Sequence, residues 1–178
     1  MASIFGHGIL ASSFSAFLPK EEKNRTIIGA GVLASMMPDL DVISFGFGIP
    51  YESWLGHRGL THSIIFALIF AWILSSATRK HGKFKTRFIF FFMCTVSHGI
   101  LDAMTSGGRG VGFFIPVENA RFFFPWRPIK VSPIGIERFF SKWGLEVLLS
   151  ELFYIAIPSL LIYLLGLQYS KWKTTGSN

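Results

Sequence analysis

The chain has 178 residues, of which 51% are hydrophobic and only 15% are charged, and its mean hydropathy is +0.48. A soluble domain carries about a quarter charged residues, so this composition favours an integral membrane protein. The net charge of +7 would suggest a nucleic-acid partner for a soluble protein, but here the positive charge lies in loops between apolar runs. That pattern is typical of membrane topology, and no nucleic-acid partner is expected.

The length suits one domain, and we expect residues 1–178 to form a single membrane-embedded domain. Cys94 is the only cysteine, which excludes a disulfide framework and a cysteine-based zinc site, and we expect its side chain to be buried. No basic residue precedes the first apolar stretch and no Ala-x-Ala site follows it. We therefore expect no cleavable signal sequence and a mature protein that retains His7.

The expected fold class is all-α, an integral membrane helical bundle with about five apolar helical segments and a long outer loop. The first two segments are short or interrupted, and such segments occur at membrane depth only where protein or a water-filled cavity covers the backbone. The last is long enough to cross about 30 Å of hydrocarbon. In chain order the segments are residues 3–18, 26–47, 64–78, 88–104 and 145–169.

Three residues mark expected irregularities in these helices. Pro38 interrupts the second segment, and Pro158 predicts a kink in the last. Thr61 is the expected N-cap of the third helix, which would then begin a turn before Ile64.

A long connection, residues 105–143, joins the last two segments and contains four early glycines. Loops of this length in a compact protein are usually functional or partly disordered. Its aromatic and basic stretch, residues 121–127, suits the headgroup level of a bilayer.

Basic residues gather in three clusters, at residues 20–25, at residues 79–87 and at Lys171 with Lys173. If each apolar segment crosses or nearly crosses the membrane, these clusters share one face and hold ten of the seventeen Lys and Arg residues. The positive-inside rule makes that face cytoplasmic. The His and Asp motifs then converge on the opposite face, whereas His81 stays in a basic loop as an ordinary solvated histidine.

His98 and Asp102 are four residues apart on an expected helix, so their side chains share a face. One helix can thereby present a nitrogen and an oxygen ligand to the same metal, or Asp102 can bridge two metals. The alternative is a polar pair that binds the neighbouring helix.

His57 and His62 flank a turn at which Gly59 permits the bend, so both imidazoles can converge on a metal. The alternative is an interfacial loop with cap residues. Arg58 between them is a candidate clamp for phosphate or carboxylate, because its planar fork suits both, or else an interfacial anchor.

Asp39 and Asp41 follow Pro38 within an apolar stretch. Both reach one site only if the helix breaks or begins there, and one can ligate while the other serves as a base or supports a histidine. Helix N-capping by Asp39 is the alternative. His7 is either a further ligand or a satisfied interior histidine.

Nitrogen and oxygen ligands without cysteine suit zinc, manganese or iron, and zinc is the expected ion. The candidates outnumber the ligands of one tetrahedral ion, so two or more ions are considered. Glu146 and Glu151 could add an oxygen ligand. The full set of candidate metal ligands is His7, Asp39, Asp41, His57, His62, His98 and Asp102.

The order of these motifs resembles that of the LexA-regulated, membrane-bound metal-dependent hydrolases of bacterial inner membranes. The resemblance covers most of the chain. That family is in turn distantly similar to the zinc-dependent phospholipase C and single-strand nuclease superfamily. The motifs that carry the resemblance are His7, PDLD at 38–41, HRGLTHS at 57–63 and HGILDAMTSGG at 98–108.

The resemblance implies a multi-pass inner-membrane protein in which His7, Asp39, His57 or His62 (or both), His98 and Asp102 bind metal. The soluble enzymes carry a further downstream His and His-x-x-x-Glu group, and no histidine follows Asp102 here. A third metal in the same form is therefore not expected, unless Glu146 or Glu151 substitutes.

The expected function is metal-dependent hydrolysis of a phosphoester in a lipid or lipid-linked substrate, at the extracytoplasmic face. Asp39 or Asp41 would act as general base and Arg58 would steady the phosphate. Amide or ester cleavage would use the same parts. The rival functions are a metal-ion or proton transporter and a non-catalytic membrane protein with a structural metal, because intramembrane His and Asp also suit ion pathways.

Overall fold

The computed structural model describes residues 1–133 and 136–175, and over these residues the fold is all-helical, with isolated β-bridges but no strand. Residues 134–135 of the long connection and 176–178 of the polar tail lie outside the described residues. The α-helices are α1 (Ile4–Ser13), α2 (Arg25–Met36), α3 (Ile64–Ala77), α4 (Phe84–Ala103), α5 (Ile136–Phe139), α6 (Lys142–Glu151) and α7 (Ile157–Thr175).

Shorter helical turns extend or join these helices. Four are 3₁₀ turns, and the fifth is a π-helical turn that makes α6 and α7 one continuous rod. They are η1 (Phe14–Phe17), η2 (Met37–Phe47), η3 (Leu60–His62), η4 (Arg79–His81) and the π turn η5 (Leu152–Ala156).

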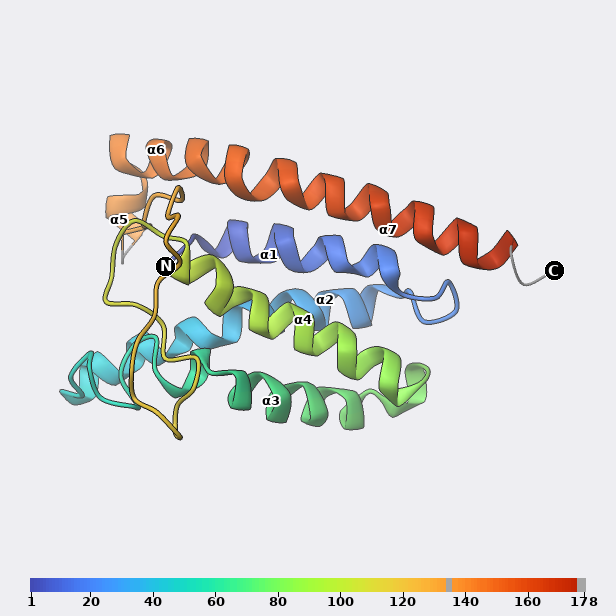
Figure 1. Ribbon diagram of the computed structural model, residues 1–178, viewed down its shortest axis with the longest axis horizontal. Coiled ribbons are helices and arrows are strands. Elements are labelled where there is room, and N and C mark those ends of the chain that lie inside the picture. The colour runs from blue at the N-terminus through green and yellow to red at the C-terminus, as the bar shows by residue number, and fades with distance from the viewer. Residues whose placement is uncertain (134–135, 176–178) are drawn as a thin grey trace.

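The long helices lie side by side along the longest axis of the molecule, with α4 between α2 and α3 (Figure 1). The connections between α1 and α2 and between α3 and α4 lie at the same end as the last turn of α7. The N-terminus, η2 and the long connection lie at the opposite end. The three basic clusters therefore share one end of the bundle, as the sequence predicted.

Small side chains let the helices approach closely in the centre of the bundle. Ala11 of α1, Ala71 of α3 and Phe91 and Cys94 of α4 are all fully buried in one cluster, which confirms the expectation for Cys94. Because lipid tails are as apolar as a protein core, this close packing, more than hydrophobicity, holds membrane helices together.

The expectation of about five membrane-crossing segments is corrected. Within the part of the chain that the structure describes, two continuous helical stretches are long and apolar enough to cross, residues 25–47 and 142–172. The stretches 4–17 and 64–77 are apolar but shorter, and α4 has 20 residues but carries several charged or ionisable ones. The apolar character of these segments agrees with the sequence, but 4–17 and 64–77 have too few residues to cross about 30 Å of hydrocarbon.

Two predicted helix boundaries also change. The N-cap of α3 is Ser63, whose side chain accepts a hydrogen bond from the Phe66 N–H, whereas Thr61 lies in η3 and binds Asp41. Near Pro38 the helical conformation is not interrupted but changes from the α-helix α2 to the 3₁₀ segment η2. Asp39 therefore lies within that turn and is not a helix N-cap.

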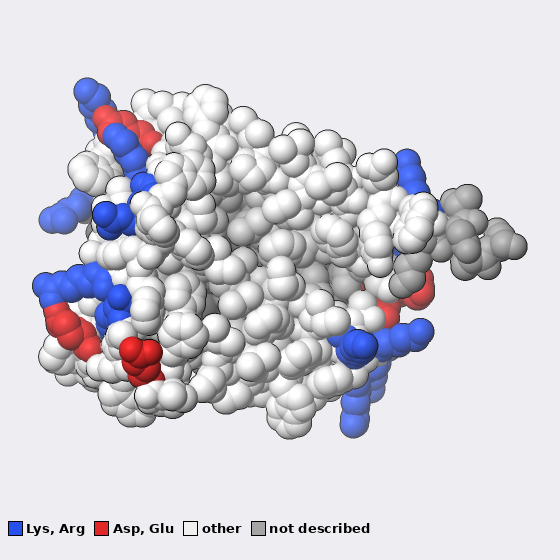
Figure 2. Space-filling model, in the orientation of Figure 1, with Lys and Arg blue, Asp and Glu red and all other residues white. Residues whose placement is uncertain are grey.

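Charged side chains gather at the two ends of the molecule on the face shown in Figure 2, and uncharged residues form the band between them. Large apolar side chains of α7 are about half exposed along this rod, as in Leu160 and Leu164. Exposed apolar surface of this extent is typical of a protein that contacts lipid.

The tight contact between α2 and α4 gives a test of the packing. A Cβ at Gly31 would lie 2.5 Å from the buried Phe90 ring, whereas one at Gly29 of the same helix would meet nothing within 4 Å. Gly31→Ala should lower the free energy of unfolding by about 1–3 kcal/mol through overpacking. Gly29→Ala should leave it unchanged or raise it by up to about 1 kcal/mol. Thermal unfolding of both variants in one detergent measures this, and equal midpoints would contradict the packing.

Candidate metal centre

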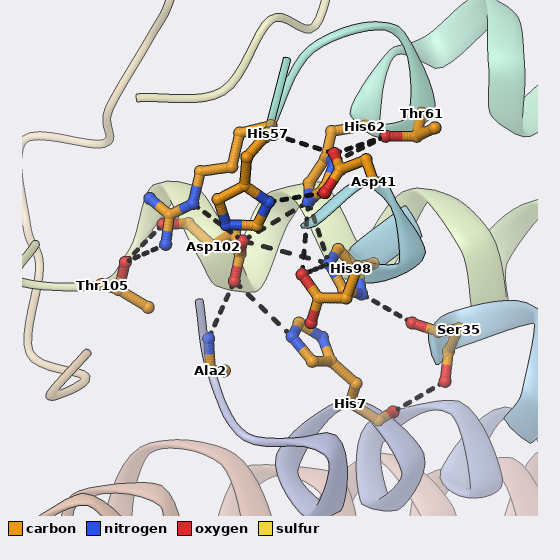
Figure 3. A network of polar contacts seen from close by, with 12 residues as sticks. Ala2, His7, Ser35, Asp41, His57, Thr61, His62, His98, Asp102 and Thr105 are labelled. Carbon is orange, nitrogen blue, oxygen red and sulfur yellow. Dashed lines mark hydrogen bonds and ion pairs between the residues drawn. The ribbon is translucent and has the colours of Figure 1, made fainter. Parts of the chain in front are cut away.

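Four ligand atoms converge at the end of the bundle that holds the N-terminus. They belong to Asp39 of η2, His62 of η3, and His98 and Asp102 one turn apart on α4, and all lie within 4.8 Å of one another. The 3₁₀ geometry of η2 brings Asp39 to this point, which meets the condition that the α-helix must end there. Figure 3 shows His62, His98 and Asp102 pointing toward one another from their separate elements.

The spacing of these atoms fits a small divalent cation. His62 Nε2 and His98 Nε2 are 3.1 Å apart, and the His–Asp distances within the group run from 3.3 to 3.9 Å. Zinc bonds of about 2.0–2.2 Å in a tetrahedron place ligand atoms roughly 3.3–3.6 Å apart. The two nitrogens and two oxygens therefore match the donor types of a zinc site, and their distances of 3.1–3.9 Å lie around the tetrahedral spacing.

Hydrogen bonds on the far side of each imidazole fix which nitrogen faces the cluster. His98 Nδ1 lies 2.6 Å from the Ser35 carbonyl oxygen, and His62 Nδ1 lies 3.1 Å from Asp41 Oδ2. Each Nδ1–H donates to its oxygen, so Nε2 is the nitrogen of each ring that faces the centre and can bind a cation. This is the arrangement that holds metal-binding histidines in place.

Several polar atoms of the centre are buried without a hydrogen-bond partner among the described residues. They are both carboxylate oxygens of Asp39 and both ring nitrogens of His7, and Asp102 Oδ2 forms ion pairs but no hydrogen bond. A buried polar group without a partner costs about 1–3 kcal/mol, and more if it is charged. A cation at this point would satisfy the Asp39 and Asp102 oxygens together.

The carboxylates give the centre a negative electrostatic potential. Burial alone lowers the pKa of His62, but its hydrogen bonds with Asp102, Asp39 and Asp41 outweigh burial and raise the pKa to about 10. The same field that favours a proton on His62 favours a divalent cation in its place.

A second group of possible ligands consists of Asp41, His57 and His62. Asp41 is already well bonded, because Oδ1 lies 2.6 Å from His57 Nδ1 and Oδ2 accepts from the Thr61 hydroxyl and the Arg58 N–H. We interpret Asp41 as the carboxylate that orients both imidazoles. Its carboxylate links His57 to His62, and the two rings also pack edge to face with centroids 5.7 Å apart.

His7 lies beside the four-atom centre and is not part of it. Its ring stacks on His98 with centroids 3.7 Å apart, and its Nε2 is 3.5 Å from Asp102 Oδ1. The sequence offered a ligand or a satisfied interior histidine. His7 is interior, but its unpartnered nitrogens face the centre (Figure 3).

Arg58 is fully buried, which disagrees with the alternative role as an interfacial anchor and leaves the phosphate clamp a prediction. Its Nε lies 3.0 Å from Asp102 Oδ2, and its terminal nitrogens donate to the Gly107 carbonyl and the Thr105 hydroxyl. Its φ of 62° is left-handed. The bend assigned to Gly59 therefore involves Arg58 as well, while Gly59 admits the Trp54 carbonyl, 2.4 Å from where a Cβ would lie.

The two candidate glutamates have other partners. Glu146 forms an exposed ion pair with Lys130. Glu151 is buried and accepts hydrogen bonds from the backbone N–H and hydroxyl of Ser3, each at 2.5 Å. His81 is exposed at the far end of the bundle, as expected.

Sequence reasoning missed several residues that hold the centre together. The Ala2 N–H donates to Asp102 Oδ1 at 2.8 Å, and Ser35 binds His98. Arg121, interpreted from sequence as an interfacial residue, donates to the carbonyls of Tyr51, Ser53 and His57. Backbone contacts of this kind leave no motif, although the position of Arg121 in a long functional loop was a partial signal.

Comparison with known proteins locates the chain among membrane proteins. The family described as YdjM inner membrane protein matches residues 1–174. The inner membrane protein YbcI of Escherichia coli (strain K12) is 37% identical over 138 residues, which cover 76% of this chain and 80% of that protein. No solved structure matches the chain. These matches support an inner-membrane location, and the hydrolase and phospholipase C-like parts of the resemblance stay predictions.

The ligand assignment predicts metal content. Purified protein should hold stoichiometric zinc or manganese by elemental analysis. His98→Ala and Asp102→Ala should each lower the metal content, because each removes one of the four convergent atoms. His81→Ala is the matched control and should keep the parental content. A parent that holds no metal at micromolar supply, or variants that fold and retain it fully, would contradict the assignment.

Proposed function

Because the chain belongs to the YdjM inner membrane protein family, we propose that it is a metal-dependent hydrolase of the inner membrane. Its substrate in this proposal is a phosphoester of a lipid or lipid-linked molecule. The observation that carries the proposal is the convergence of Asp39, His62, His98 and Asp102 at one end of an otherwise apolar bundle. Ionisable residues at membrane depth are expensive, and they mark functional sites by default.

A divalent cation, zinc in the first place and manganese as the alternative, supplies Lewis-acid activation of water and of the phosphoryl group when bound. The chain's own residues provide the rest. His62 and His98 present fixed Nε2 atoms, and Asp102 is held on both sides by Ala2 and Arg58.

Asp39 is the proposed general base. Neither of its two buried carboxylate oxygens has a hydrogen-bond partner among the described residues. One oxygen faces the imidazoles, so the other is free to take a proton from the attacking water. Asp41 suits this role less, because its oxygens are occupied by His57, Thr61 and Arg58.

Arg58 contributes by position in this proposal. Its guanidinium neutralises part of the charge of Asp102 and fixes the carboxylate toward the centre. Three of its five N–H groups have protein partners, which leaves two that could contact a substrate phosphate from within the site.

Cation transport, the rival function, is disfavoured by a residue at the other end of the bundle. Arg87 of α4 is fully buried and donates to the Ser75 carbonyl at 3.5 Å. The sequence placed it in a basic loop, residues 79–87, whereas the structure places it within α4. A guanidinium stays charged even when buried, so it repels a cation that would have to pass α4.

Activity is tested with purified protein and long-chain phospholipids or polyprenyl phosphates as substrates. Turnover should require divalent metal and stop with chelator. Loss of a group that only orients a metal ligand lowers activity roughly 10–100-fold. His98→Ala removes a ligand itself and should lower turnover by more than that. His81→Ala should retain it. Turnover that survives chelation would refute the proposal.

The proposed outer location of the site follows from the three basic clusters at the opposite end of the bundle. Reporter fusions at Gly82 and at the C-terminus should both read cytoplasmic. A fusion inserted in the exposed loop at Glu118 should read external. An external signal at Gly82 or at the C-terminus would invert the topology.

A further inference from the structure

A cavity of about 620 Å³ opens beside the metal centre. Its wall is almost wholly apolar. It includes Ile4 and Phe5 at the start of α1, Val42 of η2, Phe140 between α5 and α6, and Leu148 of α6. The volume lies within the range of about 300–1,000 Å³ that ligand sites occupy. Sites for water-soluble ligands usually carry a few polar groups that bind the ligand. In this wall the hydroxyl of Ser3 already donates a hydrogen bond to Glu151.

The cavity and the centre are both in contact with the same N-terminal backbone segment. Ala2 lines the cavity, and its N–H donates to Asp102 Oδ1 at 2.8 Å. On another side Val42 lines the cavity, and it directly follows Asp41, which orients His62. Two residues of the cavity wall are therefore connected to the centre: Ala2 by a hydrogen bond and Val42 as the neighbour of Asp41 in the sequence.

The surroundings of the cavity indicate what fills it. Leu148 belongs to the stretch 142–172, which is long and apolar enough to cross a membrane. Phe5 and Phe140 are 60% and 83% exposed at the wall. In an inner-membrane protein such side chains face hydrocarbon, where the abundant apolar ligand is a lipid acyl chain.

We infer that this cavity binds one acyl chain of the substrate and thereby places the phosphoester of the same lipid at the metal centre. The inference rests on the proposed function for the chemistry at the headgroup. It adds that the substrate is a lipid recognised by its chain, and that the chain enters sideways from the bilayer between α1 and α6.

Photo-crosslinking tests the inference without relying on activity. The full-length protein is reconstituted in phosphatidylethanolamine–phosphatidylglycerol vesicles that contain phosphatidic acid with a diazirine on one acyl chain. Crosslinks mapped by mass spectrometry should concentrate on residues 1–5 and on Val42. Leu148→Trp fills the cavity and should reduce this labelling on the order of tenfold, the equivalent of about two displaced methylene groups.

Leu149→Trp is the matched control, because Leu149 is the neighbouring residue of α6, is 49% exposed against 40% for Leu148, and does not line the cavity. It should leave the labelling unchanged, and both variants should keep parental metal content. Labelling spread evenly over the lipid-facing helices, or an equal effect of the two variants, overturns the inference.

Hydrolysis measured in the same samples separates this inference from the proposed function. Leu148→Trp should slow turnover of a long-chain phosphoester but not of a water-soluble one. If labelling concentrates in the cavity while no phosphoester is hydrolysed, the acyl-chain site stands and the hydrolase proposal fails. If hydrolysis is metal-dependent but equal for both variants and labelling is uniform, the acyl-chain site fails alone.

Discussion

The carboxylate of Asp102 is the point on which the architecture of this end of the molecule depends. It is fully buried and would be unstable alone, since an unpaired charge in an apolar medium costs many kcal/mol. The terminal segment, α1, η3 and α4 each bring a compensating group, whereas η2 brings the second carboxylate, Asp39. Stabilisation of Asp102 therefore requires these segments to assemble together. The groups that surround it are the Ala2 N–H, His7, Arg58, His62 and His98.

This dependence explains why the polar motifs are spread through the chain while the helices stay apolar. The closely packed part of the bundle, around Ala71 and Phe91, needs only small and apolar side chains. The end near the centre needs buried polar groups with partners, and those come from turns such as η2 and η3, where the backbone can direct them inward. The bundle supplies rigidity, and the turns supply the chemistry.

The sequence predicted the helical class, the apolar segments and the meeting of His62, His98 and Asp102, because charges in so apolar a chain require partners. It could not separate Asp39 from Asp41, since that depends on η2 continuing α2 as a 3₁₀ turn. It also overestimated the number of spans, because apolar stretches such as 4–17 and 64–77 were counted although they are shorter than a bilayer requires. The roles of Ala2 and Ser35 rest on backbone atoms, which every residue possesses.

The π turn at Leu152–Ala156 allows the rod of α6 and α7 to contact two different parts of the bundle, Ser3 near the centre and η1. An extra residue in a helical turn rotates everything after it by about 100° relative to an uninterrupted α-helix. Before the turn, the rod directs Glu151 to Ser3 beside the centre. After it, Gly166 meets Ala16 and Phe17 of η1. Deleting one residue within the turn would leave the rod just as apolar, yet its two halves could no longer both face the bundle.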